Sequence, residues 1–483
     1  MIDIIVITIF LLANLLIGFY SSKNIANFSE YAVWKRAFGS FAICATLSAS
    51  FIGGGYVMGN AAKVYQIGMI YAFGLLGFSL KEIFIATIVA PRMQKYAKCH
   101  SVGDMIGSHY GQKAKIITGI FSVIICAGIL GAQVSAIGTL FSVFFKVSVS
   151  TGILLGFGVI ILYTSLGGMR GVVYTDVLQF ALIVIGIPLI FIFGLHAIGG
   201  WHTIEETVPA SHINPLLHDH GTWILGSLVL TFIFGEILVP PYVQRLFMAK
   251  HTDQTRRATL AAGLLSIPIF LVSGAIGLIA YCMNNGLHPN LAIPYVIEQS
   301  MPAGMRGLVI SGLLAVIMSS AAGFLNAATI SFTNDILPTV KTIHHLSHRQ
   351  LLYIAKIVSL VVGIGSVIFA LSIHNILDIL IYAYNMWSPI IVIPLLAAIF
   401  GLTVKPFYFY ISALVGLLAT LIWSFGFHEA FHITSNIIGV LASFLAFYLA
   451  YLCNRPIKPQ LPQDSIIDTE KTYSCINKSQ NQH

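Results

Sequence analysis

Charge is the scarcest property of this sequence. Charged residues make up 9% of its 483 residues, whereas a soluble globular domain carries about 25%. The mean hydropathy is high, at +0.89, and 57% of the residues are hydrophobic. These values argue against a soluble domain and predict an all-α polytopic membrane protein. The formal charge of +8 is interpreted as charge on cytoplasmic loops, and no nucleic-acid-binding surface is expected.

Paired cysteines and familiar catalytic motifs are missing too. The six cysteines are scattered and form no C-x-x-C pair, so we predict neither a disulfide framework nor a zinc site. The sequence shows no phosphate-binding loop and no nucleophile–base motif. We therefore predict that the protein is not an enzyme.

Thirteen apolar segments are long enough to cross a bilayer. Together they predict one transmembrane domain over residues 1–455, followed by a polar cytoplasmic tail, 456–483, that is too short to be a domain. The expected spans are about 4–20, 38–62, 68–91, 116–145, 149–167, 173–198, 222–247, 258–283, 306–335, 350–373, 377–402, 406–425 and 432–453.

The distribution of basic residues predicts the orientation. With the N-terminus outside, all but four of the 25 Lys and Arg residues fall in cytoplasmic loops, the tail or the adjoining span ends. The exceptions are Lys63, Lys81, Lys146 and Arg306. Since cytoplasmic loops carry the excess of Lys and Arg, we expect a plasma (inner) membrane protein with its C-terminus in the cytoplasm.

Two spans carry helix breakers at matching positions. Gly53, Gly54 and Gly55 interrupt the second span, and Pro240 and Pro241 interrupt the seventh, five spans later. A close helix contact would also explain the glycines, and a plain kink would explain the prolines. Matched broken spans are, however, typical of transporters built from inverted repeats, with the solute site at the breaks. We therefore expect repeats over about 38–198 and 222–402.

Adjacent serines mark the ninth span. The hydroxyls of Ser319 and Ser320 could bond back to their own helix, as membrane serines commonly do. They could instead supply oxygen ligands to a small hard cation such as sodium. The serine pair alone leaves both interpretations open.

Several motifs together resemble the sodium:solute symporter family over about residues 1–455. The block Gly167-Gly168-Met169-Arg170 followed by Thr175-Asp176-Val177-Leu178-Gln179 is the most specific. The other motifs are Ser48-Ala49 with Gly54, Gln244-Arg245, and Ser319-Ser320 followed by Asn326. The resemblance implies thirteen helices around a leucine-transporter-type core of two inverted five-helix repeats.

The resemblance also implies a sodium site between the second and ninth spans. Its ligands would be the backbone carbonyls of Cys44, Leu47 and Val316 and the hydroxyls of Ser319 and Ser320. Members of the family that couple two sodium ions are similar here but carry further hydroxyl residues shortly after the serine pair. This chain has Ala322 and Gly323 at those positions, so we expect one coupled sodium. Asp176 matches the family aspartate near the cytoplasmic exit; it could equally stabilise the N-terminal dipole of the sixth span.

The motifs resemble the choline-transporter branch most closely, but its aromatic cage is depleted. Phe51 stands where that branch has a tryptophan, and aliphatic residues replace other pocket aromatics. Gln133 in the fourth span and Glu236 beside the break in the seventh are polar groups expected at pocket depth. Trp387, in the eleventh span, is the fourth residue that we expect at the substrate site.

Glu236 predicts the charge of the solute. A buried carboxylate needs a positive partner, although it could also be a structural partner for another polar group in the bundle. Arg245 would lie about 13 Å away along a continuous helix, so we favour a cationic solute such as an amine or an amino acid. Lys81 and Glu82 are adjacent, and adjacent helical residues do not face each other, so we expect each to have another partner.

These observations predict a sodium-coupled symporter that imports a small polar organic solute by alternating access. A sensor or receptor that kept the transporter fold is one alternative, and the short tail argues against it. A channel is the other, and the broken helices with a midplane site favour alternating access instead.

Overall fold

The computed structural model describes residues 1–453 except 24, 340–346, 373–382, 386, 403–404 and 428–432. The described residues form helices and no strand, so the predicted all-α class is confirmed. The tail 456–483 and parts of the spans predicted at 350–373, 377–402 and 432–453 lie outside the described residues. The helices are α1 (Ile2–Ser22), α2 (Phe28–Val33), α3 (Ser40–Phe51), α4 (Gly54–Ile67), α5 (Ile70–Phe84), α6 (Val102–Tyr110), α7 (Gln112–Phe145), α8 (Val149–Ala197), α9 (Trp201–Thr207), α10 (Ala210–Ile213), α11 (Gly221–Gly235), α12 (Pro240–Leu246), α13 (Thr252–Met283), α14 (Ala292–Ser300), α15 (Met305–Ser331), α16 (His348–Ser372), α18 (Ile393–Ile399), α19 (Pro406–Leu421) and α20 (Ser435–Cys453), with π-helical turns η2 (Ile85–Val89), η6 (Phe332–Ile336), η9 (Ser388–Val392) and η10 (Ile422–Gly426).

The predicted count of thirteen spans is not confirmed. Nine described helices are long and apolar enough to cross a membrane, or eleven if each of two bent pairs is one span. The predicted fifth and sixth spans run together in α8, which has 49 residues. The predicted eleventh span is represented by a shorter apolar helix, Ala383–Ile399.

Both predicted helix breaks are present. Helices α3 and α4 meet at a bend of 46°, and α11 and α12 meet at a bend of 63°. The first break comprises Ile52 and Gly53, because Gly54 and Gly55 already belong to the first turn of α4. The second break runs from Glu236 to Val239, and Pro240 begins α12 in the position where a helix needs no N–H donor.

Helix α8 is sharply bent at Gly168, inside the glycine–arginine block. Gly168 has φ 50° and ψ −151°, and a Cβ there would lie 2.6 Å from the ring of Tyr31, so only glycine fits. A Cβ on Gly171 would lie 3.6 Å from the carbonyl oxygen of Tyr163. Residues eight apart on a straight helix are separated by about 12 Å, so the chain folds back here. Arg170 holds the bend by donating to the Ser21 carbonyl at 3.3 Å.

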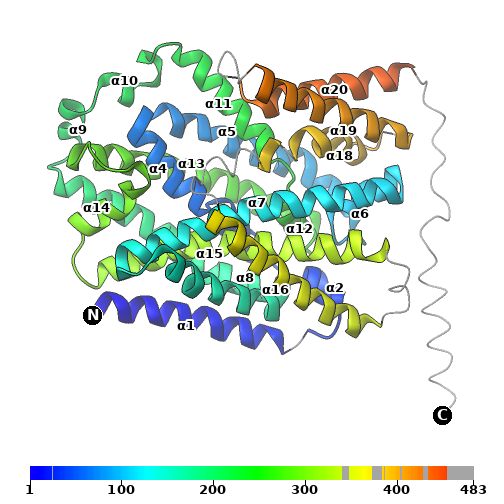
Figure 1. Cartoon of the computed structure of the whole chain (residues 1–483), viewed down its shortest axis with the longest axis horizontal. Coiled ribbons are helices and arrows are strands. Elements are labelled where there is room, and N and C mark those ends of the chain that lie inside the picture. The colour runs from blue at the N-terminus through cyan, green and yellow to red at the C-terminus, as the bar shows by residue number, and fades with distance from the viewer. Residues whose placement is uncertain are drawn as a thin grey trace.

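Helix α15 runs through the centre of the bundle (Figure 1). In the most apolar stretch of this span, 94% of the residues are buried inside the bundle. In the corresponding stretch of α1, at the edge of the bundle, only 22% are buried. Residues on α1 such as Ile5, Ile9 and Leu12 are exposed and apolar, as a lipid-facing surface requires. The central position of α15 brings the predicted serine pair against α3, α8 and α12.

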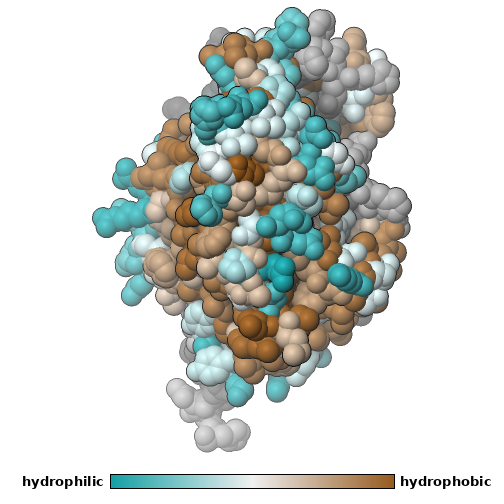
Figure 2. Space-filling view, turned by 90° about the vertical axis from the view of Figure 1, so that its left-hand side faces the viewer, coloured by the Kyte–Doolittle hydropathy of each residue, from teal (hydrophilic) through white to brown (hydrophobic). Residues whose placement is uncertain are grey.

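The start of α1 and the end of α20 lie at opposite ends of the bundle (Figure 1). Figure 2 looks onto the end that holds the N-terminus and shows hydrophilic residues gathered in patches among hydrophobic ones. An odd number of crossings would separate the two ends of the chain in this way.

Candidate functional site

The first helix break is held open by side chains from two other helices. In an unbroken helix the Gly54 N–H would bond the Ser50 carbonyl. Here the Gly54 N–H donates to Gln133 Oε1 of α7 at 3.2 Å, and the Ser50 carbonyl accepts from Ser320 Oγ of α15 at 2.7 Å. Lipid cannot satisfy freed backbone groups, so the break depends on Gln133 and Ser320.

The second break is held open in the same way. Three successive carbonyls, those of residues 235–237, accept hydrogen bonds from buried side chains. Ser388 Oγ donates to the first at 2.9 Å, Lys81 Nζ to the second at 3.2 Å and Trp387 Nε1 to the third at 3.1 Å. Helix α5 and the helix Ala383–Ile399 therefore position the unwound segment of the seventh span.

A small cavity of about 10 Å³, room for a single water molecule, lies between the two breaks. The cavity would have to widen to admit an organic solute, because drug-sized ligands occupy pockets of about 300–1,000 Å³. Its walls come from five helices and from both breaks. They are formed by Ser50, Gly53, Gly55, Tyr56, Ile129, Gln133, Glu236, Tyr242, Ser320 and Phe324.

Glu236 is the carboxylate of this cavity, and tyrosines surround it. Its side chain is 2% exposed. Tyr384 donates to Oε1 at 2.7 Å, Tyr242 donates to Oε2 at 2.6 Å, and Tyr56 lies 2.7 Å from the Tyr384 hydroxyl. The two hydroxyl donors favour the ionised carboxylate, whereas burial away from water favours the protonated form. The cavity thus presents a carboxyl group lined with aromatic faces.

One expectation about charged partners was wrong. Lys81 and Glu82 do pair with each other, at 3.0 Å, although they are adjacent on α5. The protein also supplies a cation close to Glu236, because Lys81 donates to the backbone carbonyl of that residue. Arg245, as expected, is not a partner of Glu236; its guanidinium pairs with Asp176 at 3.2 Å.

The predicted sodium ligands belong to α3 and α15, which pack against each other. Ser319 Oγ is 3.5 Å from Ser50 Oγ and donates to Asp176 Oδ1 at 2.5 Å. Val316 lies one turn before Ser319 on α15, and Cys44 and Leu47 lie on α3, which packs against it. Hydroxyls, helix carbonyls and one carboxylate give a set of oxygen donors that suits a hard cation.

Arg245 links its own helix, α12, to α3 and α8 next to this set. Its guanidinium donates to Thr46 at 2.9 Å and Ser50 at 2.5 Å on α3, and to Asp176 on α8. Thr46 in turn donates to Asp176. A Cβ on Gly323 would lie 2.9 Å from the guanidinium, so glycine at this position makes room for it.

Of the four predicted substrate residues, Gln133 and Glu236 line the cavity, whereas Phe51 and Trp387 are not among its lining residues. The Phe51 ring packs against Tyr242, with ring centroids 5.3 Å apart, and Trp387 supports the second break. Both residues therefore lie behind the cavity wall.

The sequence interpretation missed several side chains of the candidate site. These are Thr46, Ser50, Lys81 as a neighbour of Glu236, Tyr242 and Tyr384. Tyr242 follows the proline pair, and this position was a usable signal. Tyr384 is 148 residues from Glu236, and no local pattern marks it.

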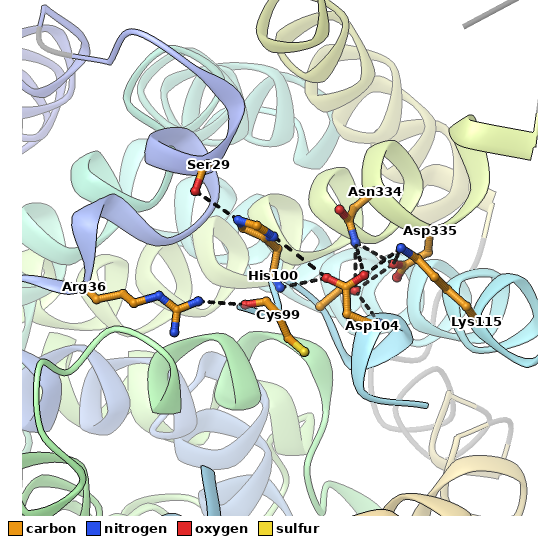
Figure 3. A network of polar contacts seen from close by, with 9 residues as sticks. Ser29, Arg36, Cys99, His100, Asp104, Lys115, Asn334 and Asp335 are labelled. Atoms are coloured by element: carbon orange, nitrogen blue, oxygen red, sulfur yellow. Dashed lines mark hydrogen bonds and ion pairs between the residues drawn. The ribbon is translucent and has the colours of Figure 1, made fainter. Parts of the chain in front are cut away.

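A second polar cluster lies away from the cavity (Figure 3). Asp104 of α6 accepts from Lys115 of α7 at 2.6 Å and from Asn334 of η6 at 2.9 Å. Asp335 accepts from Ser101 at 2.6 Å. Burial raises the pKa of Asp104, but the Lys115 ammonium and its hydrogen bond lower it more, so this pKa lies below its ordinary value. The cluster fastens the end of the ninth span to α6 and α7.

Solved structures share this fold. A Na⁺-coupled sialic acid symporter in a substrate-bound, outward-open state superposes with a TM-score of 0.82 over 94% of this chain and 98% of that one, at 22% identity. The nucleobase-cation-symport-1 transporter Mhp1, in a closed conformation, gives a TM-score of 0.57 over 88% of this chain and 95% of its own.

Curated relatives include transporters of two solutes. The high-affinity choline transporter 1 of Drosophila melanogaster is 25% identical over 79% of this chain, and the match spans 63% of that protein's length. The osmoregulated proline transporter OpuE of Bacillus subtilis is 23% identical over 94% of this chain and 96% of its own. The proline transporter PutP of the same organism is 24% identical over 95% of this chain and its whole length.

The family model described as the sodium:solute symporter family matches residues 31–405, well over half of the chain. The motifs that carry the resemblance include the bend at Gly168, Asp176 and the serine pair, all within the matched range. The chain therefore belongs to the sodium:solute symporter family, a family of transporters, not enzymes, whose co-transported ion is sodium.

Proposed function

We propose that this protein imports a small cationic solute, an amine or an amino acid, together with one sodium ion. The observation that carries the proposal is Glu236, a buried carboxyl group in the wall of the cavity between the two helix breaks. Aromatic rings and a carboxylate favour an ammonium group. The choline and proline carried by relatives both contain a cationic nitrogen.

The proposed sodium site comprises the carbonyls of Cys44, Leu47 and Val316 and the hydroxyls of Ser319 and Ser320. Ser320 also caps the break in the second span and lines the cavity. Sodium bound to this serine would therefore order the same segment that forms the solute cavity. Such shared contacts give each ligand a different affinity for the two states, which is the basis of coupling.

We also propose the finer topology. The bend at Gly168 would divide α8 into two spans, and the helix Ala383–Ile399 would complete a further one, giving thirteen with the two bent pairs. Residues 38–198 and 222–402 would be the inverted repeats, since each begins with a broken span. The excess of Lys and Arg would place the N-terminus outside and the C-terminus in the cytoplasm.

The test is uptake by purified protein in liposomes under an inward sodium gradient. Labelled choline and proline are the probes, and a neutral sugar is the control. We expect saturable accumulation of at least one cationic probe above its external concentration, abolished when potassium replaces sodium. Uptake that never exceeds equilibration would favour a channel, and accumulation of the sugar alone would refute the assignment of Glu236.

A further inference from the structure

We propose that Lys81, Glu82 and Glu236 form a proton-binding site, and that the cationic group of the solute displaces its proton on binding. The proposal rests on the proposed function, because it requires a cationic solute next to Glu236. It adds a second exchanged ion to the transport cycle: protons would leave the site as solute enters it.

The three groups form one cluster inside the bundle. Lys81 and Glu82 are each 1% exposed and Glu236 is 2% exposed. Lys81 Nζ lies 3.0 Å from Glu82 Oε1, 3.2 Å from the Glu236 carbonyl and 3.4 Å from the centre of the Phe78 ring. Lys81 therefore contacts the Glu82 carboxylate and the backbone of Glu236, and it is itself fixed by an aromatic face.

The charges in this cluster do not balance. The cluster holds two carboxylates and one ammonium, which leaves one negative charge, and the ammonium pairs with Glu82. The other titratable groups around Glu236 are the hydroxyls of Tyr56, Tyr242 and Tyr384 and the thiol of Cys126, all neutral at physiological pH. The buried Arg245 is paired with Asp176 instead. Among the described residues, Lys81 pairs with the Glu82 carboxylate, and no Lys or Arg forms an ion pair with the Glu236 carboxylate.

An unpaired charge in a low-dielectric interior is strongly unfavourable, and a buried acid commonly takes up a proton instead. A solute ammonium beside Glu236 would neutralise the same charge. The two cations therefore exclude each other. When the solute binds, the O–H bond of the protonated carboxyl breaks, the proton passes to water in the opened cavity, and the carboxylate keeps the electron pair and faces the ammonium.

Only Glu236 faces the cavity, since neither Lys81 nor Glu82 is among its lining residues. Glu82 thus acts on the solute site through charge, whereas Glu236 acts through contact. The two carboxylates titrate as a coupled pair, so the exchanged proton belongs to both of them. This separation makes the charge balance testable without touching the cavity wall.

Calorimetry in saturating sodium tests the exchange, with choline and proline as probes from about pH 6 to 8. Neither probe changes its charge in this range, so any proton released comes from the protein. Titrations in two buffers of different ionisation enthalpy count the released protons. We expect about one proton per bound solute, and an affinity that falls about tenfold for each pH unit at the acidic end.

Two variants test the charge balance. Glu82→Gln leaves one ammonium and one carboxylate, so the affinity for the probe should become independent of pH and proton release should stop. The double variant Lys81→Met with Glu82→Met leaves Glu236 alone, so the net charge of −1 and the proton release should remain.

Binding of choline or proline to the wild-type protein without proton release would overturn the inference, whatever the variants do. Proton release by Glu82→Gln equal to that of the wild type would also overturn it. If neither probe binds the wild type at any pH, the proposed function has failed instead. Because the wild-type result decides alone, misfolding of a variant does not leave the inference untested.

Discussion

Replacing Gly53 by alanine should weaken sodium binding although the new methyl group touches no ion. A Cβ at this position would lie 2.5 Å from Ser320 Oγ and 3.2 Å from Ser320 Cβ, closer than carbon atoms and hydroxyls pack. Gly53 has φ −74° and ψ 165°, which alanine adopts without strain. The steric conflict with Ser320 is therefore the whole effect.

The conflict is relieved when the Ser320 hydroxyl rotates away. That rotation breaks its 2.7 Å hydrogen bond to the Ser50 carbonyl and leaves a buried acceptor unpaired, which costs about 1–3 kcal/mol. It also removes one proposed sodium ligand. A loss of about 1.4 kcal/mol or more in ion binding corresponds to at least a tenfold rise in the sodium concentration for half-saturation.

The assay is a sodium titration of thermal unfolding, repeated for sodium-dependent uptake. Gly226→Ala is the matched control, because Gly226 lies on α11 and a Cβ there meets nothing within 4 Å. We expect the control to match the wild type and Gly53→Ala to need at least ten times more sodium. Equal half-saturation in Gly53→Ala and the control would refute the placement of Ser320 as a ligand.

Four further results are expected. Ser319→Ala and Ser320→Ala should each raise the sodium half-saturation more than they lower expression; an unchanged sodium dependence in both would contradict the proposed site. Glu236→Gln should lower the affinity for the cationic solute more than tenfold, about 1.4 kcal/mol, measured by calorimetry, and wild-type affinity would make this residue structural. The ratio of labelled sodium flux to labelled solute flux should be one, and a ratio of two would refute a single site. The pKa of Asp104 is lowered in the folded state, so this group stabilises the fold above its unfolded pKa near 3.8, and the stabilisation is lost as the pH falls through the folded pKa. Lys115→Met removes the main cause of the lowered pKa, so the variant should begin to unfold at a higher pH in an acid titration. Loss of the helical circular dichroism signal measures this unfolding.

Local residue chemistry made the two helix breaks predictable. Glycine and proline disfavour a helix wherever they occur, so Gly53 and Pro240 could be placed without knowing their neighbours. A lone carboxylate in an apolar segment is similarly conspicuous, and Glu236 was identified for that reason. The class of the protein followed from its low charge, because membrane spans require it.

The number of spans could not be settled in this way. A bend such as that at Gly168 separates two apolar segments without a polar loop, so hydropathy counts two spans where the backbone runs on as one long, bent helix. The bend brings Gly168 against Tyr31 and allows Arg170 to bond the Ser21 carbonyl, and both contacts require the chain to fold back.

Partners were decided by the tertiary structure alone. Tyr56 and Tyr384, which complete the hydrogen bonds around Glu236, are 328 residues apart, and Arg245 meets Asp176 across 69 residues. A hydrogen bond depends on distances of a few tenths of an ångström, which helix packing sets and residue order does not. The sequence therefore determined which charges must be buried, and the packing of α5, α8, α12 and α15 decided which of them neutralise one another.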